Sequence, residues 1–157
     1  MLTTPLDTPW RHTHLGYWLA QASKRFDARV LALMAANDSM PLTLANLAAR
    51  GHLTASHVHI TRHLALAGSR LTDLAACAGV SKQAMGKLVD QCEAWGLVQR
   101  QPDLRDARAC LVVFTPAGLS WLQAFQDAVT QAQTELQEAV GPEVATVLAL
   151  GLEAYAA

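Results

Sequence analysis

Residues 71–118 constrain the fold of this chain more than any other segment. They predict two short helices, because Thr72 and Ser81 can cap helix N-termini and Gly79 and Gly96 can adopt the left-handed conformation that ends a helix. A stretch rich in β-branched and aromatic residues follows and predicts a strand that pairs back on the chain directly after the second helix. We therefore expect two helices joined by a tight turn and followed by a β-hairpin.

The second predicted helix has one apolar and one polar face. Its apolar positions recur every three or four residues and predict the buried side: Met85, Leu88, Val89, Cys92 and Trp95. Lys82, Gln83 and Lys87 lie on the opposite face, together with Gly86. Lysine and glutamine at the start of such a helix can reach base edges in a DNA major groove. An ordinary helical hairpin with a solvated face is the alternative that the two helices alone leave open.

The predicted hairpin favours DNA binding over that alternative. It pairs residues 97–101 with 109–115 and has charged residues in the loop between them. An arginine at the tip of a rigid hairpin suits a narrow minor groove, whose negative potential attracts it. Helix, turn, helix and basic hairpin in this order predict a winged helix-turn-helix with a two-stranded β wing. The expected DNA-binding residues are Ser81, Lys82, Gln83, Lys87, Arg100, Asp103, Arg105 and Arg108.

Three segments make the chain resemble the multiple antibiotic resistance regulators (MarR family). They are LTDLAACAGVSKQAMGKLVDQCEAWGLVQR at 71–100, DLRDAR at 103–108 and FTPAG at 114–118. The resemblance implies that Arg105 enters the minor groove and that Asp103 helps to hold it. Many members of that family carry a polar side chain where this sequence has Gly86.

The composition predicts one soluble domain over residues 1–157. The chain is 52% hydrophobic, which is enough for a sizeable core. No basic segment followed by an apolar run begins the chain, and no apolar segment approaches the roughly 20 residues of a membrane span. The three cysteines have no close-pair spacing, so we expect no disulfide framework and a cytoplasmic protein.

Charge is distributed unevenly along the chain, although the net charge is only −1. Residues 1–115 contain all 12 Lys and Arg and 8 of the 13 acidic residues, so their net charge is +4. Residues 116–157 contain the other 5 acidic residues and no Lys or Arg, so their net charge is −5. This asymmetry indicates a part that faces DNA and a part that stays away from the phosphates, although a merely acidic exposed helix fits it too.

Helical periodicity at both ends of the chain predicts a mainly α protein of the α+β type. We expect a DNA-binding lobe over 54–115 and dimerisation helices over 14–36 and 116–157. In the resembling family both chain ends form a two-fold dimer, which fits the apolar stripes seen here. Packing of the terminal helices within one chain is the alternative, and we expect both kinds of contact.

The sequence offers little support for an enzyme, a cofactor or a metal. It has no glycine-rich phosphate loop, no nucleophile with a nearby base motif and no paired carboxylates. His59 and His63 share a helix face, but a metal site needs about four ligands. Cys77 and Cys92 occupy apolar positions and are expected to be small buried residues. Metal-responsive or redox-responsive regulation therefore remains only an alternative.

These observations predict a dimeric, sequence-specific transcriptional regulator that binds a pseudo-palindromic DNA duplex. The resemblance implies a repressor released by a small, often aromatic or anionic, effector bound between the dimer helices and the DNA-binding lobe. Candidate effector-binding residues are His14, Trp18, Arg25, Arg62 and His63. For Trp18 we expect packing in the core in preference to effector binding. The alternative function is a winged-helix module that binds protein, and salt-sensitive retention on heparin or duplex DNA distinguishes the two.

Overall fold

The computed structural model describes residues 9–38, 40, 46–47 and 54–157. Helices make up most of this part of the chain: η1 (Pro9–His12), α1 (Leu15–Ala35), α3 (Ala55–His63), α4 (Leu71–Ala78), α5 (Lys82–Ala94), α6 (Pro116–Val140) and α7 (Pro142–Ala156). The strands are β1 (Ser69–Arg70), β2 (Val98–Asp103) and β3 (Asp106–Phe114), which form an antiparallel sheet in the order β1-β3-β2. The predicted mainly α fold with a β wing is confirmed. The short helix expected over residues 43–50 lies outside the described residues, apart from a helical Asn46 and Leu47.

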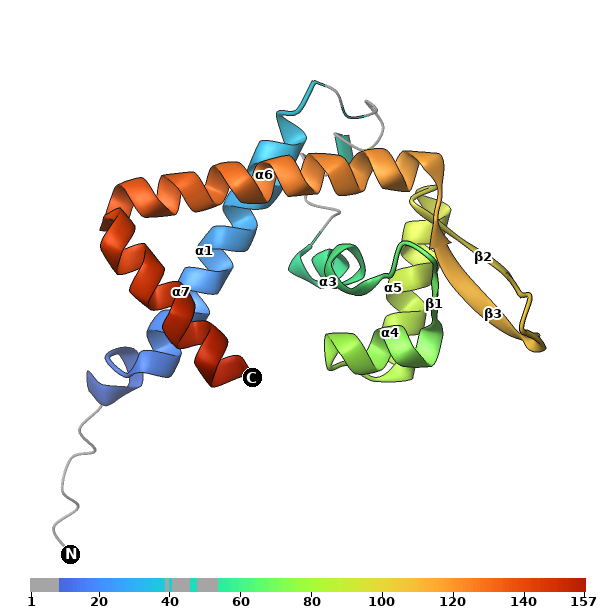
Figure 1. Cartoon of the computed structure of the whole chain (residues 1–157), viewed down its shortest axis with the longest axis horizontal. Helices are drawn as coiled ribbons and strands as arrows, with labels where there is room; N and C mark the ends of the chain where they lie inside the picture. Colours follow the sequence, from blue (N-terminus) through green and yellow to red (C-terminus); the bar gives the residue numbers. More distant parts are fainter. Residues whose placement is uncertain (1–8, 39, 41–45, 48–53) are drawn as a thin grey trace, which may run out of the picture.

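The long helix α6 joins the two halves of the molecule (Figure 1). Helix α1 crosses α6, and α7 folds back from the end of α6 that lies farthest from the sheet. At the other end of α6 lie α3, α4, α5 and the sheet. An ion pair fixes the crossing, because Arg29 Nε in α1 lies 2.7 Å from Glu135 Oε2 in α6.

The turn between α4 and α5 forms as the sequence predicts. Gly79 adopts the left-handed conformation (φ 67°, ψ 28°) and ends α4. The Ser81 hydroxyl then accepts a hydrogen bond of 3.1 Å from the Ala84 amide and caps α5. The expected N-cap of α4 is wrong. Arg70, which ends β1, is the N-cap, so the chain passes from strand directly into helix and Thr72 is already helical.

The sheet differs from the expected hairpin in two respects. Its strands extend to Asp103 and Asp106, so the turn of the wing contains only Leu104 and Arg105. The two-residue strand β1 also pairs with β3 and places Arg70 opposite Leu111. A two-residue strand is too short to produce an alternating pattern, which is why the sequence does not predict it.

From the sequence we also predict a helix that Thr54 caps and that ends at Gly68; α3 begins after Thr54 but ends at His63. It forms part of a single core under α6 that also includes Met34 of α1, Leu74 of α4 and Met85 of α5. Trp121 of α6 lies in this core, where its indole N–H donates a hydrogen bond of 3.1 Å to the Thr61 hydroxyl.

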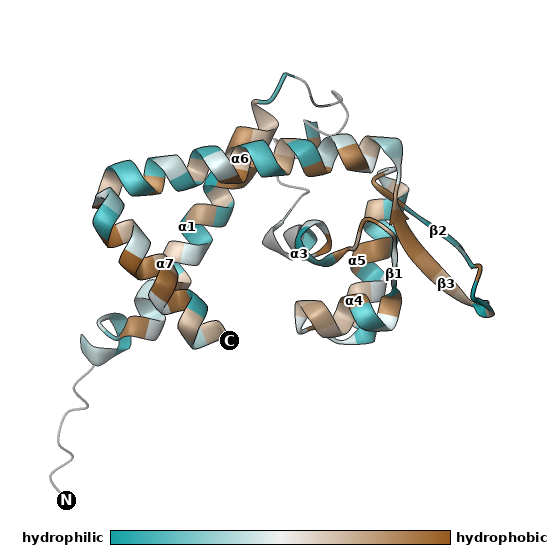
Figure 2. Ribbon diagram, viewed as in Figure 1, coloured by the Kyte–Doolittle hydropathy of each residue, from teal (hydrophilic) through white to brown (hydrophobic). Residues whose placement is uncertain are grey.

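Apolar side chains also remain uncovered on the terminal helices. Figure 2 shows apolar residues along α7, and Ala145 is the only buried one among them. The exposed group on the terminal helices comprises Trp10, Leu15, Trp18, Leu119, Val140, Val144, Val147, Leu148, Leu150, Leu152 and Tyr155. Trp18 is 56% exposed, so it is not packed in the core of this chain. Within the described ranges no single helix is long and apolar enough to span a membrane; α6 and α7 pass that test only as a pair bent by 118°.

Candidate nucleic-acid interface

Helix α5 presents its predicted polar face to solvent. Lys82, Gln83 and Lys87 are exposed, whereas Met85 and Val89 on the opposite side are fully buried. The N-terminal end of α5 lies beside α4 and points away from α6 (Figure 1). The buried face fixes the helix against the core and leaves its first two turns free to enter a groove.

Asp103 is a positioning residue of the wing. It is only 7% exposed, and its Oδ2 accepts hydrogen bonds from Arg70 Nε at 3.1 Å and Arg70 Nη2 at 2.8 Å. Its Oδ1 accepts a bond of 2.9 Å from the backbone amide of Arg105. The Arg105 amide and the Arg70 guanidinium hold the pKa of Asp103 below its ordinary value. Asp103 thus holds Arg105 through its backbone and is too enclosed to present a carboxylate to DNA.

Arg70 is the part of this arrangement that the sequence analysis missed. It lies one residue before α4 and reaches Asp103, 33 residues further along the chain, because β1 pairs with β3. Arg70 Nη2 also lies 3.7 Å from Asp106 Oδ2 on the other strand of the wing. No local pattern marks this residue, and only the pairing of β1 would have revealed it.

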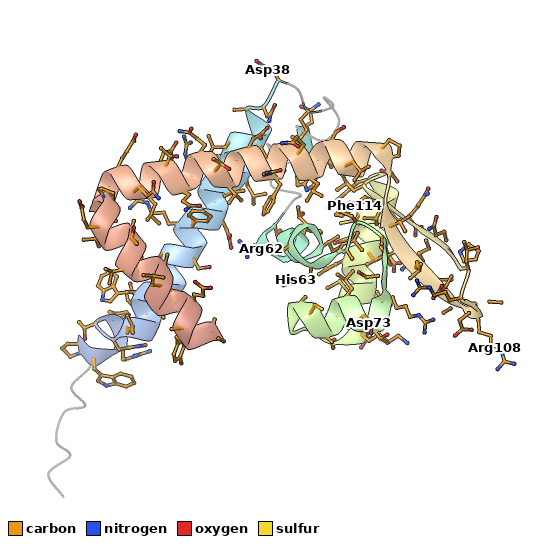
Figure 3. The ribbon with its side chains drawn as sticks, in the orientation of Figure 1. Asp38, Arg62, His63, Asp73, Arg108 and Phe114 are labelled. Atoms are coloured by element: carbon orange, nitrogen blue, oxygen red, sulfur yellow. The ribbon has the colours of Figure 1, made fainter. Side chains whose placement is uncertain are left out.

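The tip of the wing is exposed. Leu104 is fully exposed and Arg105 is exposed beside it, in a two-residue turn fixed by Asp103. Arg108 extends outward from the far end of the wing (Figure 3), and its amide donates a hydrogen bond of 3.1 Å to Asp106 Oδ1. The geometry suits insertion of one arginine into a narrow groove, with a second placed near the backbone.

Arg100 is predicted to bind DNA, but in the structure its guanidinium pairs with carboxylates of the protein. Its Nη2 lies 2.6 Å from Asp90 Oδ1, and its Nη1 pairs with Glu93, both on α5. Its guanidinium therefore joins β2 to α5 and neutralises two carboxylates of that helix. The sequence could not show this, because the pairing depends on where the sheet lies relative to α5.

The predicted effector residues do not converge in one chain. His14 caps the start of α1, where its Nδ1 accepts a hydrogen bond of 3.2 Å from the Tyr17 amide. Arg62 of α3 pairs with Asp27 of α1, with Nη2 and Oδ1 2.6 Å apart. Positions 14 and 27 are thirteen residues apart in the chain, which corresponds to about 20 Å along α1. Trp18 and Arg25 are exposed on α1, and His63 is half-buried on α3 (Figure 3).

The positions of the cysteines and histidines bear on the metal-responsive and redox-responsive alternatives. Among the described residues no group of three or more His, Cys, Asp or Glu could hold a metal ion, and the side chain of His59 lies outside them. Cys92 is buried as expected, and burial raises its pKa to about 12. The same expectation is wrong for Cys77, which is exposed because α4 buries its Leu74 and Ala75 side instead.

A two-helix turn with a capped recognition helix and a three-stranded sheet that extends into a basic wing defines a winged helix-turn-helix protein. The model of the MarR family matches residues 53–109, the segment from α3 through most of the wing. Over this segment the chain is similar to the MarR family. The comparison with curated proteins finds no significant match.

Solved structures share the fold over nearly the whole chain. The transcriptional repressor CouR bound to a 23-mer DNA duplex superposes with a TM-score of 0.67 at 21% identity, over 98% of this chain and 100% of that one. Wild-type MarR from E. coli superposes with a TM-score of 0.63 at 23% identity, over 90% of this chain and 96% of that one. BpsR from Bordetella bronchiseptica superposes with a TM-score of 0.64 at 17% identity, over 91% of this chain and 98% of that one. Its structure is described in connection with the regulation of its DNA binding by 6-hydroxynicotinic acid. At these identities the likeness concerns the fold.

Proposed function

We propose that this protein is a homodimeric, sequence-specific transcriptional regulator that represses transcription until a small-molecule effector releases it from duplex DNA. The observation that carries the proposal is the charge arrangement of the lobe. Lys82, Lys87, Arg105 and Arg108 form no ion pair with any residue that the structure describes. Nearby carboxylates are instead paired with Arg70 and Arg100, so they offset these four cations less.

These four cations lie on the two elements that a winged helix-turn-helix places against DNA. Contacts to phosphates make affinity fall steeply with salt, whereas contacts to base edges give sequence preference. We assign Ser81, Lys82, Gln83 and Lys87 to the major groove and Arg105 and Arg108 to the wing's groove and backbone contacts. The structure of CouR bound to a DNA duplex and the regulation of DNA binding of BpsR by 6-hydroxynicotinic acid support the proposal that this chain binds DNA under the control of an aromatic acid.

The exposed apolar surface of the terminal helices supports the dimer. Trp18 on α1 and Val147 and Tyr155 on α7 expose apolar surface, which would be buried against a second copy. A two-fold dimer would read a pseudo-palindrome with half-sites about 10 base pairs apart. Sedimentation should give a dimer at micromolar concentration, and deletion of residues 141–157 should abolish it. A stable full-length monomer under these conditions would contradict the proposal.

The test of function is selection of bound sequences from a random duplex library, followed by binding measurements across a salt series. Gln83→Ala should weaken the selected operator and relax preference at one position of each half-site, by about 1–3 kcal/mol. Arg105→Ala should weaken operator and random duplex together and reduce the salt slope by about one. Absence of any salt-sensitive binding to duplex would favour the alternative, a winged-helix module that binds protein.

Release by an effector has its own thermodynamic test. A ligand that favours a different spacing of the two recognition helices must weaken DNA binding, and operator DNA must weaken the ligand by the same factor. A panel of aromatic carboxylic acids screened by thermal shift supplies the ligand. A tight ligand with no effect on operator affinity would refute this part of the proposal.

A further inference from the structure

Gly86 lies at the fifth position of the 13-residue helix α5, where nothing in the backbone explains a glycine. Glycine is the least favourable residue in a helix interior after proline. Glycine is favoured where the backbone needs a positive φ, and Gly79 and Gly96, on either side of α5, do have a positive φ. Gly86 does not, so its conformation is open to any residue.

The packing of the fold does not explain it either. A Cβ atom added at Gly86 would have Leu71 Cδ2 as its nearest neighbour, at an ordinary contact distance of 3.8 Å. At Gly118, by contrast, a Cβ would lie 1.9 Å from the carbonyl oxygen of Leu97. An alanine would therefore fit at Gly86 and would favour the helix.

The position of Gly86 points to a partner outside the chain. It lies three residues after Gln83 and next to Lys87, is partly exposed, and stands at the edge of the polar face of α5, beside Leu71 of α4. The missing side chain leaves the helix backbone partly exposed at the edge of the face that we assign to the major groove. Glycine is typical of sites where a backbone approaches a ligand closely.

We infer that Gly86 is a specificity-determining residue, which lets the backbone of α5 lie against a base edge that carries the thymine C5-methyl group. The inference rests on the proposed DNA-binding function. The thymine methyl is the apolar group exposed in the major groove, and it needs space rather than a hydrogen-bond partner. Gln83 and Lys87 on either side would read the neighbouring bases by hydrogen bonding.

The experiment compares Gly86→Ala with Gly151→Ala as a matched control. Gly151 is the other helical glycine with room for a methyl group, since a Cβ there meets nothing within 4 Å, and it lies in α7 away from the lobe. Each substitution should raise the melting temperature by about 2–4 °C. Gly86→Ala should weaken the selected operator about tenfold or more, the effect of a mismatched base pair, and leave random duplex binding unchanged. Gly151→Ala controls for the gain in helix stability alone, and sedimentation shows whether it keeps the oligomeric state of the wild type.

A second measurement tests the same contact from the side of the DNA. Each thymine of the operator is replaced in turn by deoxyuridine, which removes only the methyl group. One replacement per half-site should weaken the wild type and have no further effect on Gly86→Ala. The inference would be overturned if Gly86→Ala bound the operator as tightly as the wild type does. It would also be overturned if each deoxyuridine replacement lowered the affinity of both proteins equally. Failure of the wild type to bind any duplex would instead overturn the proposed function itself, and the inference with it.

Discussion

Gly118 joins the wing to α6, and replacing it with alanine tests whether this junction is as closely packed as the structure shows. The Cβ of an alanine would lie 1.9 Å from the carbonyl oxygen of Leu97 and 3.1 Å from Phe114 Cδ1. Contacts of a Cβ below 3.0 Å essentially do not occur, so the two segments must separate by about 1 Å. The obstacle is backbone, which cannot rotate away as a flexible side chain can.

The separation also affects the hydrogen bonds at this point. The Leu97 oxygen accepts a bond of 3.1 Å from the Thr115 amide, and the Thr115 hydroxyl caps α6 by accepting from the Gly118 amide at 3.0 Å. Overpacking costs about 1–3 kcal/mol, and each bond weakened adds about 1 kcal/mol. The better helix propensity of alanine returns up to about 1 kcal/mol. We expect a net loss of about 2–4 kcal/mol, or roughly 5–15 °C in melting temperature.

Urea unfolding followed by circular dichroism gives the free energy, with Gly151→Ala as the control for an unobstructed helical glycine. Because the junction positions the wing, Gly118→Ala should also weaken operator binding at temperatures where it remains folded. A variant as stable as the wild type would show that the chain passes Leu97 with more room than the structure indicates. The argument from packing at Gly118 would then be refuted.

Three further outcomes follow from the charges and cysteines. Arg29 holds the pKa of Glu135 at about 2, below its ordinary 4.5, so the stability that this carboxylate contributes is fully present above pH 4.5 and is lost as the pH falls toward 2. The stability difference between wild type and Glu135→Gln should therefore shrink below pH 4.5, and a constant difference would contradict it. Asp103→Asn should weaken the hydrogen bonds to Arg70 and speed hydrogen exchange of the wing amides. Unchanged exchange rates would show that the Arg70–Asp103 pair does not stabilise the wing. Cys92 should resist alkylation in the native protein at pH 8 while the two exposed cysteines react, and equal rates would exclude the burial that raises its pKa to about 12.

The sequence predicts the lobe well because its signals are local. Gly79 and Ser81 determine the turn within three residues of each other, and the apolar periodicity of α5 alone identifies its exposed face. Pro116 is a third local signal, because proline is favoured in the first turn of a helix and α6 begins at this residue. Each of these features depends on residues adjacent in the chain.

The parts that the sequence does not predict depend on distant residues. Arg70 pairs with Asp103, and Arg100 pairs with two carboxylates of α5, only after β1 and β2 are placed in the sheet. Arg100 looks the same in the sequence as the unpaired Arg105. The candidate effector residues fail for a related reason: helical spacing places His14 on α1 but does not bring it near Arg62.

The length of α6 has a mechanical consequence for the groove contacts. Its 25 residues span about 38 Å, with α7 attached at one end and the wing at the other. A tilt of about 5° at the α7 end displaces the wing end by about 3 Å, close to the rise of about 3.4 Å between base pairs. A rearrangement of the terminal helices too small to disturb the core is thus amplified by α6 into a mismatch of about one base pair between the wing and its groove.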